Sequence, residues 1–307
     1  MNRAPDTTFE ARARPVIAWW DPPADGATNM ALDEALAAEA ARLDRVLVRI
    51  STWSEPTLSL GAFQAIAEAR AHPALAGLRI VRRPSGGGAI LHGSDVTLSV
   101  AVPRLHPYGG TPQRLYDAVH EALVAELSAC GVEAGLSAGG TLERAGRGGR
   151  SGSDRVDPDP GPEAPSAAGP TAEGPLLCFD RRAVGDVVVP VPDGRFGSDA
   201  KILGSAQRRL RGAVLQHGSL LLAANRLVPE ESRHPGLEEL QRSDGSGGSW
   251  AWGSPAGTGL LRGWLTRLAA TLGEGLDTPA GRFVPSPEAG YEEGLTRFQQ
   301  DSWNGRR

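Results

Sequence analysis

The sequence predicts a mixed α/β or α+β sheet domain that one long insertion interrupts. Strand-like runs of Val, Ile and Leu occur on both sides of a tract rich in Gly and Pro. Two segments carry apolar residues at helical spacing, and the tract at 137–175 is almost free of large apolar side chains. A chain of 307 residues, 40% of them hydrophobic, is long enough to bury a core without disulfides or metals.

Before the tract, the pattern alternates between helices and strands. Helices are predicted at 29–41 and 112–129, where apolar residues recur every three or four positions. Strands are predicted at 45–51, 57–63, 78–83 and 95–103. Asp33 and Glu34 lie near the start of the first helix, where the helix dipole stabilises acids, so we interpret them as capping residues.

After the tract, the pattern favours strands first and helices later. Strands are predicted at 186–191, 201–207 and 213–223, and the remainder is mostly helical. The tract at 137–175 cannot bury enough surface to offset its ordering entropy, so we expect a disordered insertion there. A short flexible loop is expected at 243–249, and the whole of 1–307 is expected to form one domain.

Net charge and residue counts argue against several classes of function. The formal net charge of -4 gives no basic field, so neither nucleic acid nor an anionic membrane is an expected partner. No apolar run is long enough for a signal sequence or a membrane span, which predicts a cytoplasmic protein. The two cysteines and six histidines lack disulfide or metal-ligand spacing, so no metal is expected.

A single lysine, Lys201, stands in the segment SDAKILGSAQRR, and every other member of the 32 Lys and Arg residues is an arginine. Arg replaces Lys on a solvated surface, but not where a compact ammonium or a tunable pKa is required. A single lysine can also occur by chance, so its role has to be inferred from the residues around Lys201.

The segment RRPSGGGAILH, at 82–92, places three consecutive glycines between two strand-like runs. Glycine allows a ligand or another backbone to approach closely, although a mobile hairpin turn fits the pattern equally well. The segment lacks the spacing of a phosphate-binding loop.

Three further groups could carry chemistry. Cys178 directly follows the insertion, where its thiol could be exposed and reactive, or could fill a small buried space as free cysteines commonly do. We interpret Cys130, at the end of a helix, as a small buried hydrophobe. His217 is a candidate acid, base or hydrogen-bond donor, or an ordinary core residue. The arginines within 208–211 form a solvated hairpin or a docking site for an acidic protein.

Taken in chain order, several of these segments resemble the biotin/lipoate protein ligase catalytic family. The resemblance is carried by NMALDEAL, PTLSLGAFQ, RRPSGGGAILH, KILGSAQRR, LQHGSLLL and DSWNGRR. It implies an α+β, class II synthetase-like fold in which a mixed, mainly antiparallel sheet is flanked by helices. It also implies an essential lysine at Lys201 and an acyl pocket walled by the glycine-rich segment. The substrate-binding residues implied are Arg82, Ser85, Gly86, Gly87, Gly88, His92, Gly204, Ser205, Ala206 and His217.

Within this family the sequence is similar to the cysteine-dependent octanoyltransferases, since it lacks the Asn-Asp pair and accessory domain typical of ATP-dependent lipoate ligases. The resemblance implies that octanoyl passes from acyl carrier protein to Cys178, and then to the lysine of a lipoyl-domain protein such as the glycine-cleavage H protein. In this hypothesis Lys201 and backbone N–H groups near 86–88 stabilise the oxyanion, and no cofactor is needed.

Three alternatives stay open from the sequence. The chain could be an ATP-dependent lipoate ligase, or an amidotransferase that takes octanoyl from H protein. It could also be a non-catalytic scaffold that binds an acyl group or its carrier.

Overall fold

The structure is a computed structural model that describes residues 14–138, 140–141, 175–191, 195–228, 233–242 and 249–306. Most of the predicted insertion at 137–175, and all but the last residue of the predicted loop at 243–249, lie outside these described residues. Ser137 belongs to the fold, because its backbone N–H donates to the Asp186 carbonyl oxygen at 2.8 Å.

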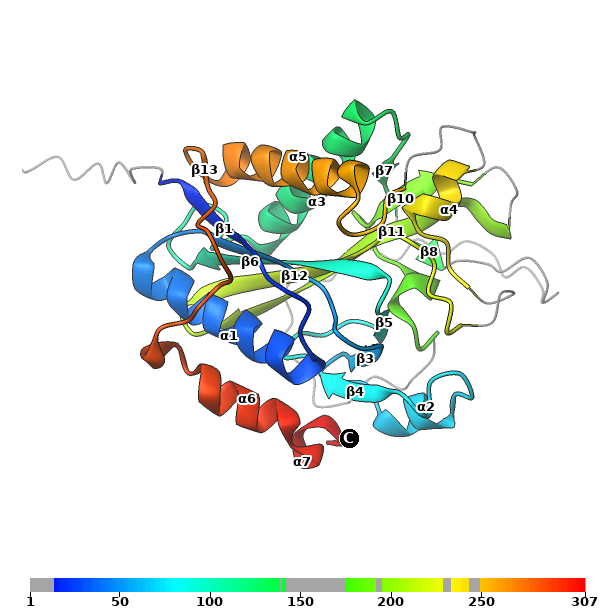
Figure 1. Cartoon of the computed structure of the whole chain (residues 1–307), viewed down its shortest axis with the longest axis horizontal. Coiled ribbons are helices and arrows are strands. Elements are labelled where there is room, and N and C mark those ends of the chain that lie inside the picture. The colour runs from blue at the N-terminus through cyan, green and yellow to red at the C-terminus, as the bar shows by residue number, and fades with distance from the viewer. Residues whose placement is uncertain are drawn as a thin grey trace, which may run out of the picture.

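Eight strands form the main sheet, which runs across the centre of the molecule (Figure 1). In spatial order they are β13 (Leu276–Asp277), β1 (Val16–Trp20), β2 (Leu47–Ser51), β6 (Asp95–Pro103), β12 (Ala213–Leu221), β11 (Arg195–Leu210), β10 (Val187–Pro190) and β7 (Gly135–Leu136). Strand β1 pairs in parallel with β13 and with β2, and the other pairs are antiparallel. The expected mixed, mainly antiparallel sheet is therefore confirmed.

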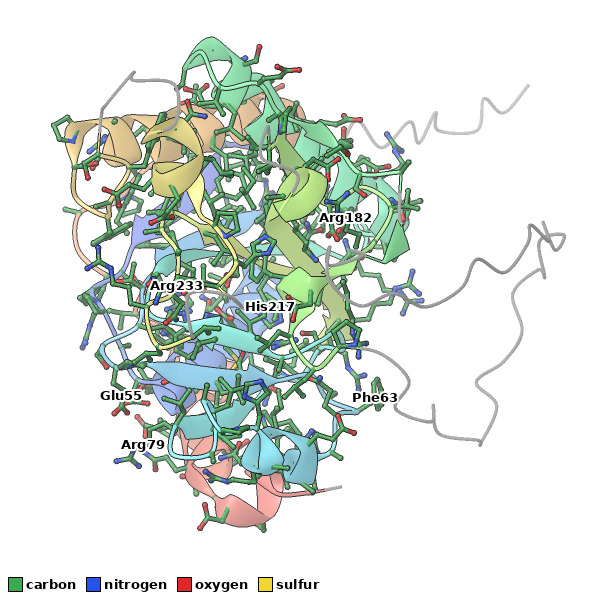
Figure 2. The ribbon with its side chains drawn as sticks, turned by 90° about the vertical axis from the view of Figure 1, so that its right-hand side faces the viewer. Glu55, Phe63, Arg79, Arg182, His217 and Arg233 are labelled. Atoms are coloured by element: carbon green, nitrogen blue, oxygen red, sulfur yellow. The ribbon has the colours of Figure 1, made fainter. Side chains whose placement is uncertain are left out.

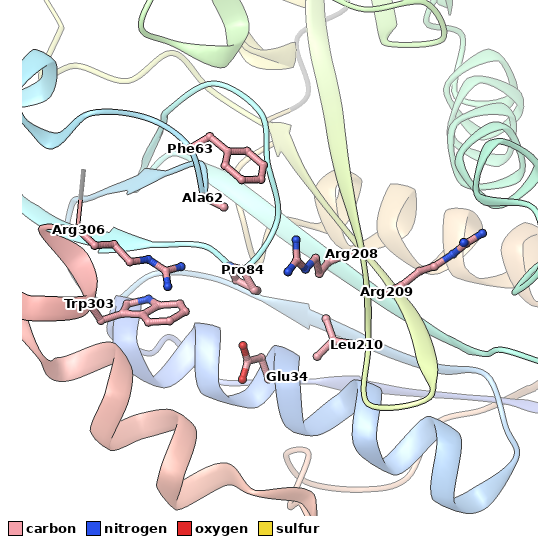
Figure 3. Close-up of a pocket in the computed structure, with 9 residues that line it drawn as sticks. All are labelled: Glu34, Ala62, Phe63, Pro84, Arg208, Arg209, Leu210, Trp303 and Arg306. Carbon is pink, nitrogen blue, oxygen red and sulfur yellow. The ribbon is translucent and has the colours of Figure 1, made fainter. Parts of the chain in front are cut away.

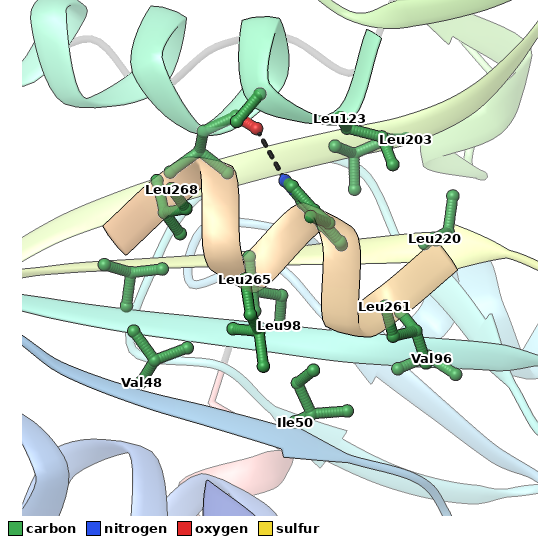
Figure 4. Packing of buried hydrophobic residues seen from close by; sticks show 14 of the residues in the cluster. Val48, Ile50, Val96, Leu98, Leu123, Leu203, Leu220, Leu261, Leu265 and Leu268 are labelled. Atoms are coloured by element: carbon green, nitrogen blue, oxygen red, sulfur yellow. Dashed lines mark hydrogen bonds between the residues drawn. The ribbon is translucent and has the colours of Figure 1, made fainter. Parts of the chain in front are cut away.

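Helices cover both faces of this sheet (Figure 1). Helices α3 (Pro112–Ala129) and α5 (Pro255–Leu272) lie on one face, and α1 (Gly26–Leu43) lies on the other. Side chains alternate along each strand, so Val48 and Ile50 of β2 pack toward α5 while Leu47 packs toward α1. Figure 4 shows α5 seated on this core, with the Trp264 indole donating to the Val119 carbonyl of α3 at 2.9 Å.

Smaller elements complete the fold. A second sheet has the order β4 (Arg79–Arg82), β3 (Thr57–Leu60) and β5 (Ile90–His92), with β3 parallel to β4 and antiparallel to β5. Strands β8 (Gly140–Thr141) and β9 (Arg181–Arg182) pair with each other. The remaining short elements are α2 (Ile66–Ala71), the 3-10 turn η1 (Cys178–Asp180), α4 (Leu237–Arg242), η3 (Pro287–Ala289), α6 (Tyr291–Gln299) and α7 (Asp301–Asn304).

Two residue-level predictions are wrong. Helix α1 begins at Gly26 and is capped by Asp25, whose carboxylate accepts from the Thr28 N–H at 2.9 Å, so Asp33 and Glu34 are not caps. Cys130 is exposed rather than buried, and it caps the C-terminal end of α3.

Among the residues that the structure describes, no helix is both long and apolar enough to cross a bilayer. Within the same residues, no three His, Cys, Asp or Glu side chains are arranged to hold a metal ion.

Candidate active site

Cys178 and Lys201 meet at one end of the main sheet. Cys178 opens the 3-10 turn η1, and Lys201 lies in the middle of β11, next to β10. The Lys201 Nζ is 3.5 Å from the Cys178 Sγ and 3.3 Å from the Cys178 carbonyl oxygen. The lysine side chain is buried, whereas Cys178 keeps partial exposure, so the sulfur is the accessible partner of the pair.

Asp186 holds the Lys201 ammonium in place. Its Oδ2 lies 2.8 Å from the Lys201 Nζ, and both side chains are almost fully buried. The other oxygen, Oδ1, accepts from the Tyr116 hydroxyl of α3 at 2.8 Å. Burial alone would lower the pKa of Lys201, but negative charge at Cys178 and the Asp186 carboxylate together raise it above its ordinary value. Lys201 is therefore a fixed cation at neutral pH.

Two glycines make room for this pair. A Cβ on Gly204 would lie 2.4 Å from the Lys201 Cε and 2.6 Å from its Nζ. A Cβ on Gly88 would lie 2.9 Å from the Cys178 Cα. These contacts are closer than real side chains allow, so only glycine lets the glycine-rich segment and β11 approach the reactive groups.

The glycine-rich segment is also bonded directly to the turn that carries Cys178. The Cys178 N–H donates to the Ala89 carbonyl at 2.7 Å, and the Ala89 N–H donates to the Leu176 carbonyl at 2.9 Å. Arg83 fixes the segment from the inside, since its guanidinium donates to the carbonyls of Gly86 and Gly88 at 3.1 and 2.8 Å. Burial lowers the pKa of Arg83 to about 10, which leaves it charged at neutral pH.

His217 connects β12 to both the glycine-rich segment and α1. Its Nδ1 donates to the Asp33 Oδ2 at 3.1 Å, and its Nε2 bonds to the Ser85 hydroxyl. Burial acts to raise the pKa of Asp33, but His217 and Arg49 hold it below its ordinary value. Figure 2 shows His217 near the centre of the molecule. The residue is thus both a buried core histidine and part of a Ser-His-Asp chain.

His92 forms a second chain of the same kind. Its Nδ1 donates to the Asp95 Oδ2 at 2.8 Å, and its Nε2 lies 2.7 Å from the Ser59 hydroxyl oxygen. Its ring stacks on Trp53 with centroids 3.7 Å apart. Burial lowers the pKa of His92 despite the Asp95 charge, so the ring is neutral at pH 7.

These groups surround one mainly apolar cavity. It is lined by Met30, Trp53, Arg83, Gly87, Ile90, His92, Thr97, Cys178, Gly204, Ser205, Ala206, His217, Gly218 and Ser219. Four of the predicted site residues do not line the cavity but contact residues that do: Ser85, Gly86, Gly88 and Lys201. Arg82 lies elsewhere: it is fully buried, and its guanidinium donates to the carbonyls of Gly61, Gln64 and Asn304. Arg83, not Arg82, faces the cavity.

Sequence reasoning missed several residues of this site. Asp186 is the first residue of the strand predicted at 186–191, and this position between Cys178 and Lys201 was the signal that could have found it. The sequence could not show that Arg83, and not the adjacent Arg82, faces the cavity, because this depends on the orientation of the strand. Three more residues belong to no recognisable sequence motif and reach the site by hydrogen bonds to the two histidines: Asp33, Asp95 and Ser59.

Comparison with known proteins places the chain. The model of the lipoyl protein ligase A/B catalytic domain matches residues 25–233. The chain belongs to this family. Among its lipoyl protein ligase A/B relatives, Octanoyltransferase LipM of Kyrpidia tusciae is 36% identical over 200 residues, which cover 64% of this chain and 62% of the relative. Octanoyltransferase LipM of Bacillus subtilis is 32% identical over 203 residues, covering 65% and 62%. Neither match reaches two thirds of the relative.

Solved structures agree with the lipoyl protein ligase A/B assignment at the level of the fold. A lipoate-protein ligase A bound with ATP has a TM-score of 0.58 at 17% identity, over 96% of this chain and 98% of that one. The bi-partite lipoate protein ligase of Thermoplasma acidophilum has a TM-score of 0.56 at 18% identity, over the same shares of the two chains.

The arrangement in this lipoyl protein ligase A/B domain suits acyl transfer. A partly exposed sulfur lies beside a buried cation, at the wall of an apolar cavity. A thiolate is the nucleophilic form of cysteine, and a neighbouring ammonium stabilises it. The same ammonium can donate to an oxyanion that forms at the sulfur.

Proposed function

We propose that this protein is an octanoyltransferase of lipoate biosynthesis that carries octanoyl on Cys178. The donor is octanoyl-acyl carrier protein, and the acceptor is the lysine of a lipoyl-domain protein such as the glycine-cleavage H protein. The observation that carries this proposal is the 3.5 Å contact between the Cys178 Sγ and the Lys201 Nζ at the wall of the apolar cavity. The relatives named Octanoyltransferase LipM support the choice of acyl group.

In the first half-reaction, the Cys178 thiolate attacks the thioester carbonyl of the donor. A new carbon–sulfur bond forms to Cys178, and the bond to the carrier sulfur breaks, so the carrier leaves as a thiolate. Lys201 donates to the oxyanion of the tetrahedral intermediate. One thioester is exchanged for another, and therefore no ATP is required.

In the second half-reaction, the amine of the acceptor lysine attacks the acyl-Cys178 carbonyl. The amide bond forms, the Cys178 sulfur leaves, and the proton lost by the amine is available to that sulfur. Conversion of a thioester into an amide is downhill, which makes the transfer effectively irreversible. Replacement of Cys178 should block both half-reactions.

The test is the intact mass of the purified protein after incubation with octanoyl-carrier protein in the absence of ATP. We expect one octanoyl adduct that hydroxylamine removes, present in wild type and absent in Cys178→Ala. The exposed Cys130 is the matched control, so Cys130→Ala should keep the adduct. Lipoyl-domain acylation that appears only with free acid and ATP would overturn the proposal in favour of a ligase.

Octanoyl-H protein is the second donor to be compared in that assay, because the same cysteine chemistry would serve an amidotransferase. Faster acylation of Cys178 from octanoyl-H protein than from octanoyl-carrier protein would replace the proposed donor. Normal folding with no adduct or transfer from any donor would favour the non-catalytic scaffold.

A further inference from the structure

A groove of about 410 Å³ opens beside the glycine-rich segment. Its sides include Pro84 of that segment, Arg208 and Leu210 of β11, and the C-terminal residues Trp303 and Arg306. Figure 3 shows the guanidinium groups of Arg208 and Arg306 entering from opposite sides, with Pro84 between them and the Trp303 ring beneath Arg306. Two cations that converge on one hollow make a site for an anion.

Strand β11 connects this groove to the acyl cavity. Alternate residues of a strand face the same way, and Ala206 lines the cavity while Arg208 lines the groove. Arg208 therefore follows the cavity wall by two residues, roughly 7 Å along the strand. Gln207, which lies between them, faces α3, since its side chain donates to the Pro112 carbonyl.

The charge of Arg208 is not neutralised by the carboxylate that lines the groove. Glu34 is the acidic residue of the lining, and it forms an ion pair with Arg297. Among the described residues, no carboxylate forms an ion pair with Arg208, whose side chain is exposed. The Arg306 guanidinium lies over the Trp303 ring, 3.2 Å from its centroid, which gives the groove a flat apolar surface next to its charge.

We propose that this groove binds the phosphodiester of the phosphopantetheine arm that presents octanoyl to Cys178, with Arg208 and Arg306 as its phosphate contacts. The inference rests on the proposed octanoyl transfer. In the donor, the acyl thioester is followed by a flexible, largely uncharged arm and then by a phosphate. In the protein, the acyl cavity is followed by β11 and then by the two arginines, so the parts occur in the same order. Lysine-linked octanoyl on H protein has no phosphate at this place, so the groove favours the carrier protein as donor.

The test compares octanoyl-pantetheine with its phosphate ester as donors for acylation of Cys178, followed by intact mass. In wild type we expect kcat/KM to favour the phosphate ester by about tenfold, the effect of a charge-assisted contact that solvent partly screens. Arg208→Gln and Arg306→Gln should each bring the ratio close to one. Because both donors are measured on the same preparation, a loss of folded protein cancels from the ratio.

Arg209→Gln is the matched control: Arg209 is the next residue on the same strand and also lines the groove, but its guanidinium is directed away from those of Arg208 and Arg306 (Figure 3) and donates to the Gly110 carbonyl. This variant should keep the wild-type ratio. Equal rates with the two donors in wild type, or an unchanged ratio in Arg208→Gln, would overturn the phosphate site. Absence of an adduct from either donor would instead overturn the proposed octanoyl transfer.

Octanoyl-coenzyme A carries the same phosphopantetheine arm as the carrier protein. Comparing these two donors therefore shows which molecule the groove serves. A carrier protein as the natural donor predicts a higher kcat/KM for octanoyl-carrier protein than for octanoyl-coenzyme A. The reverse order would assign the groove to coenzyme A and overturn the carrier assignment.

Discussion

At the scale of single residues, the site depends on a cation that has almost no freedom to move. The Lys201 Nζ has oxygen or sulfur neighbours from Asp186, Cys178 and Arg181 at 2.8–3.5 Å. Gly204 lies against the end of the same side chain. A guanidinium has a different shape and donor geometry, so this is a position where arginine could not replace lysine.

Gly204→Ala should remove activity and also lower stability, because it separates the buried Lys201 ammonium from the Asp186 carboxylate. The added methyl group would overlap the Lys201 Cε and Nζ, and the lysine would have to turn away from Cys178. We expect the rate of Cys178 acylation to fall by at least about 100-fold, the order of a lost oxyanion contact. The measurement is single-turnover acylation together with thermal unfolding.

The matched control for this prediction is Gly259→Ala in α5, where nothing lies within 4 Å of the added methyl group. It should keep full activity and gain a little helix stability, because alanine is the better helix former. Full activity in Gly204→Ala would show that the position of Lys201 is not critical.

The sequence singled out the two residues of the proposed acyl transfer, but not the residues that contact them. Lys201 was found as the single lysine and Cys178 from its place after the insertion. Asp186 was missed because nothing in a linear sequence shows that its carboxylate reaches a lysine on the next strand. The same holds for Asp33, which was interpreted as a cap but bonds to His217 and Arg49.

At the scale of elements, His120 attaches α3 to the strands that carry the site. Its Nδ1 donates to the Gly185 carbonyl and its Nε2 accepts from the Ser205 hydroxyl, each at 2.7 Å. Burial lowers the pKa of His120 to about 4. The folded state therefore keeps the ring neutral at pH values where the unfolded chain, with an ordinary pKa near 6.5, takes up a proton.

Stability should consequently fall as the pH drops from about 6.5 to about 4, since the unfolded state binds more protons throughout that range. His120 accounts for roughly 3 kcal/mol of this loss. Urea unfolding of wild type and His120→Gln at several pH values measures it. The stability advantage of wild type should shrink toward pH 4, and an advantage that does not change with pH would contradict the assignment.

Elements with strong periodicity were predicted closely, and short ones were not. The predicted bounds of β6 and α3 match the structure, because both have long and regular apolar patterns. Strand β1, strand β5 and helix α2 gave no distinct pattern, since they are only five, three and six residues long. Such elements form because tertiary neighbours complete their hydrogen bonds, which local sequence does not reveal.

At the scale of the whole molecule, the C-terminal helices fasten the strand that leads into the glycine-rich segment. Asn304 accepts from the Arg82 backbone N–H at 2.9 Å through its side chain, and from the Arg82 guanidinium at 3.0 and 3.2 Å through its carbonyl. The Trp303 indole donates to the Arg82 carbonyl at 3.2 Å. These contacts give the buried Arg82 a structural role.

Asn304→Ala should destabilise the protein by about 1–3 kcal/mol, because it removes an acceptor from a buried N–H and a donor to the Phe298 carbonyl. Chemical denaturation measures the change. Gln300→Ala is the control, since that exposed residue precedes α7 without a side-chain capping bond, and it should unfold like wild type. Equal stability of the two variants would contradict the fastening role of α7.

The contact between Arg82 and Asn304 can form only late in the synthesis of the chain. The two residues are separated by 222 positions, and a ribosome that adds about 5–20 residues per second takes roughly 10–45 seconds to travel that distance. During this interval the guanidinium of Arg82 lacks the carbonyl that Asn304 supplies, and the glycine-rich segment lacks its anchor. The nascent chain therefore cannot complete the contacts that anchor the glycine-rich segment until synthesis has passed α7.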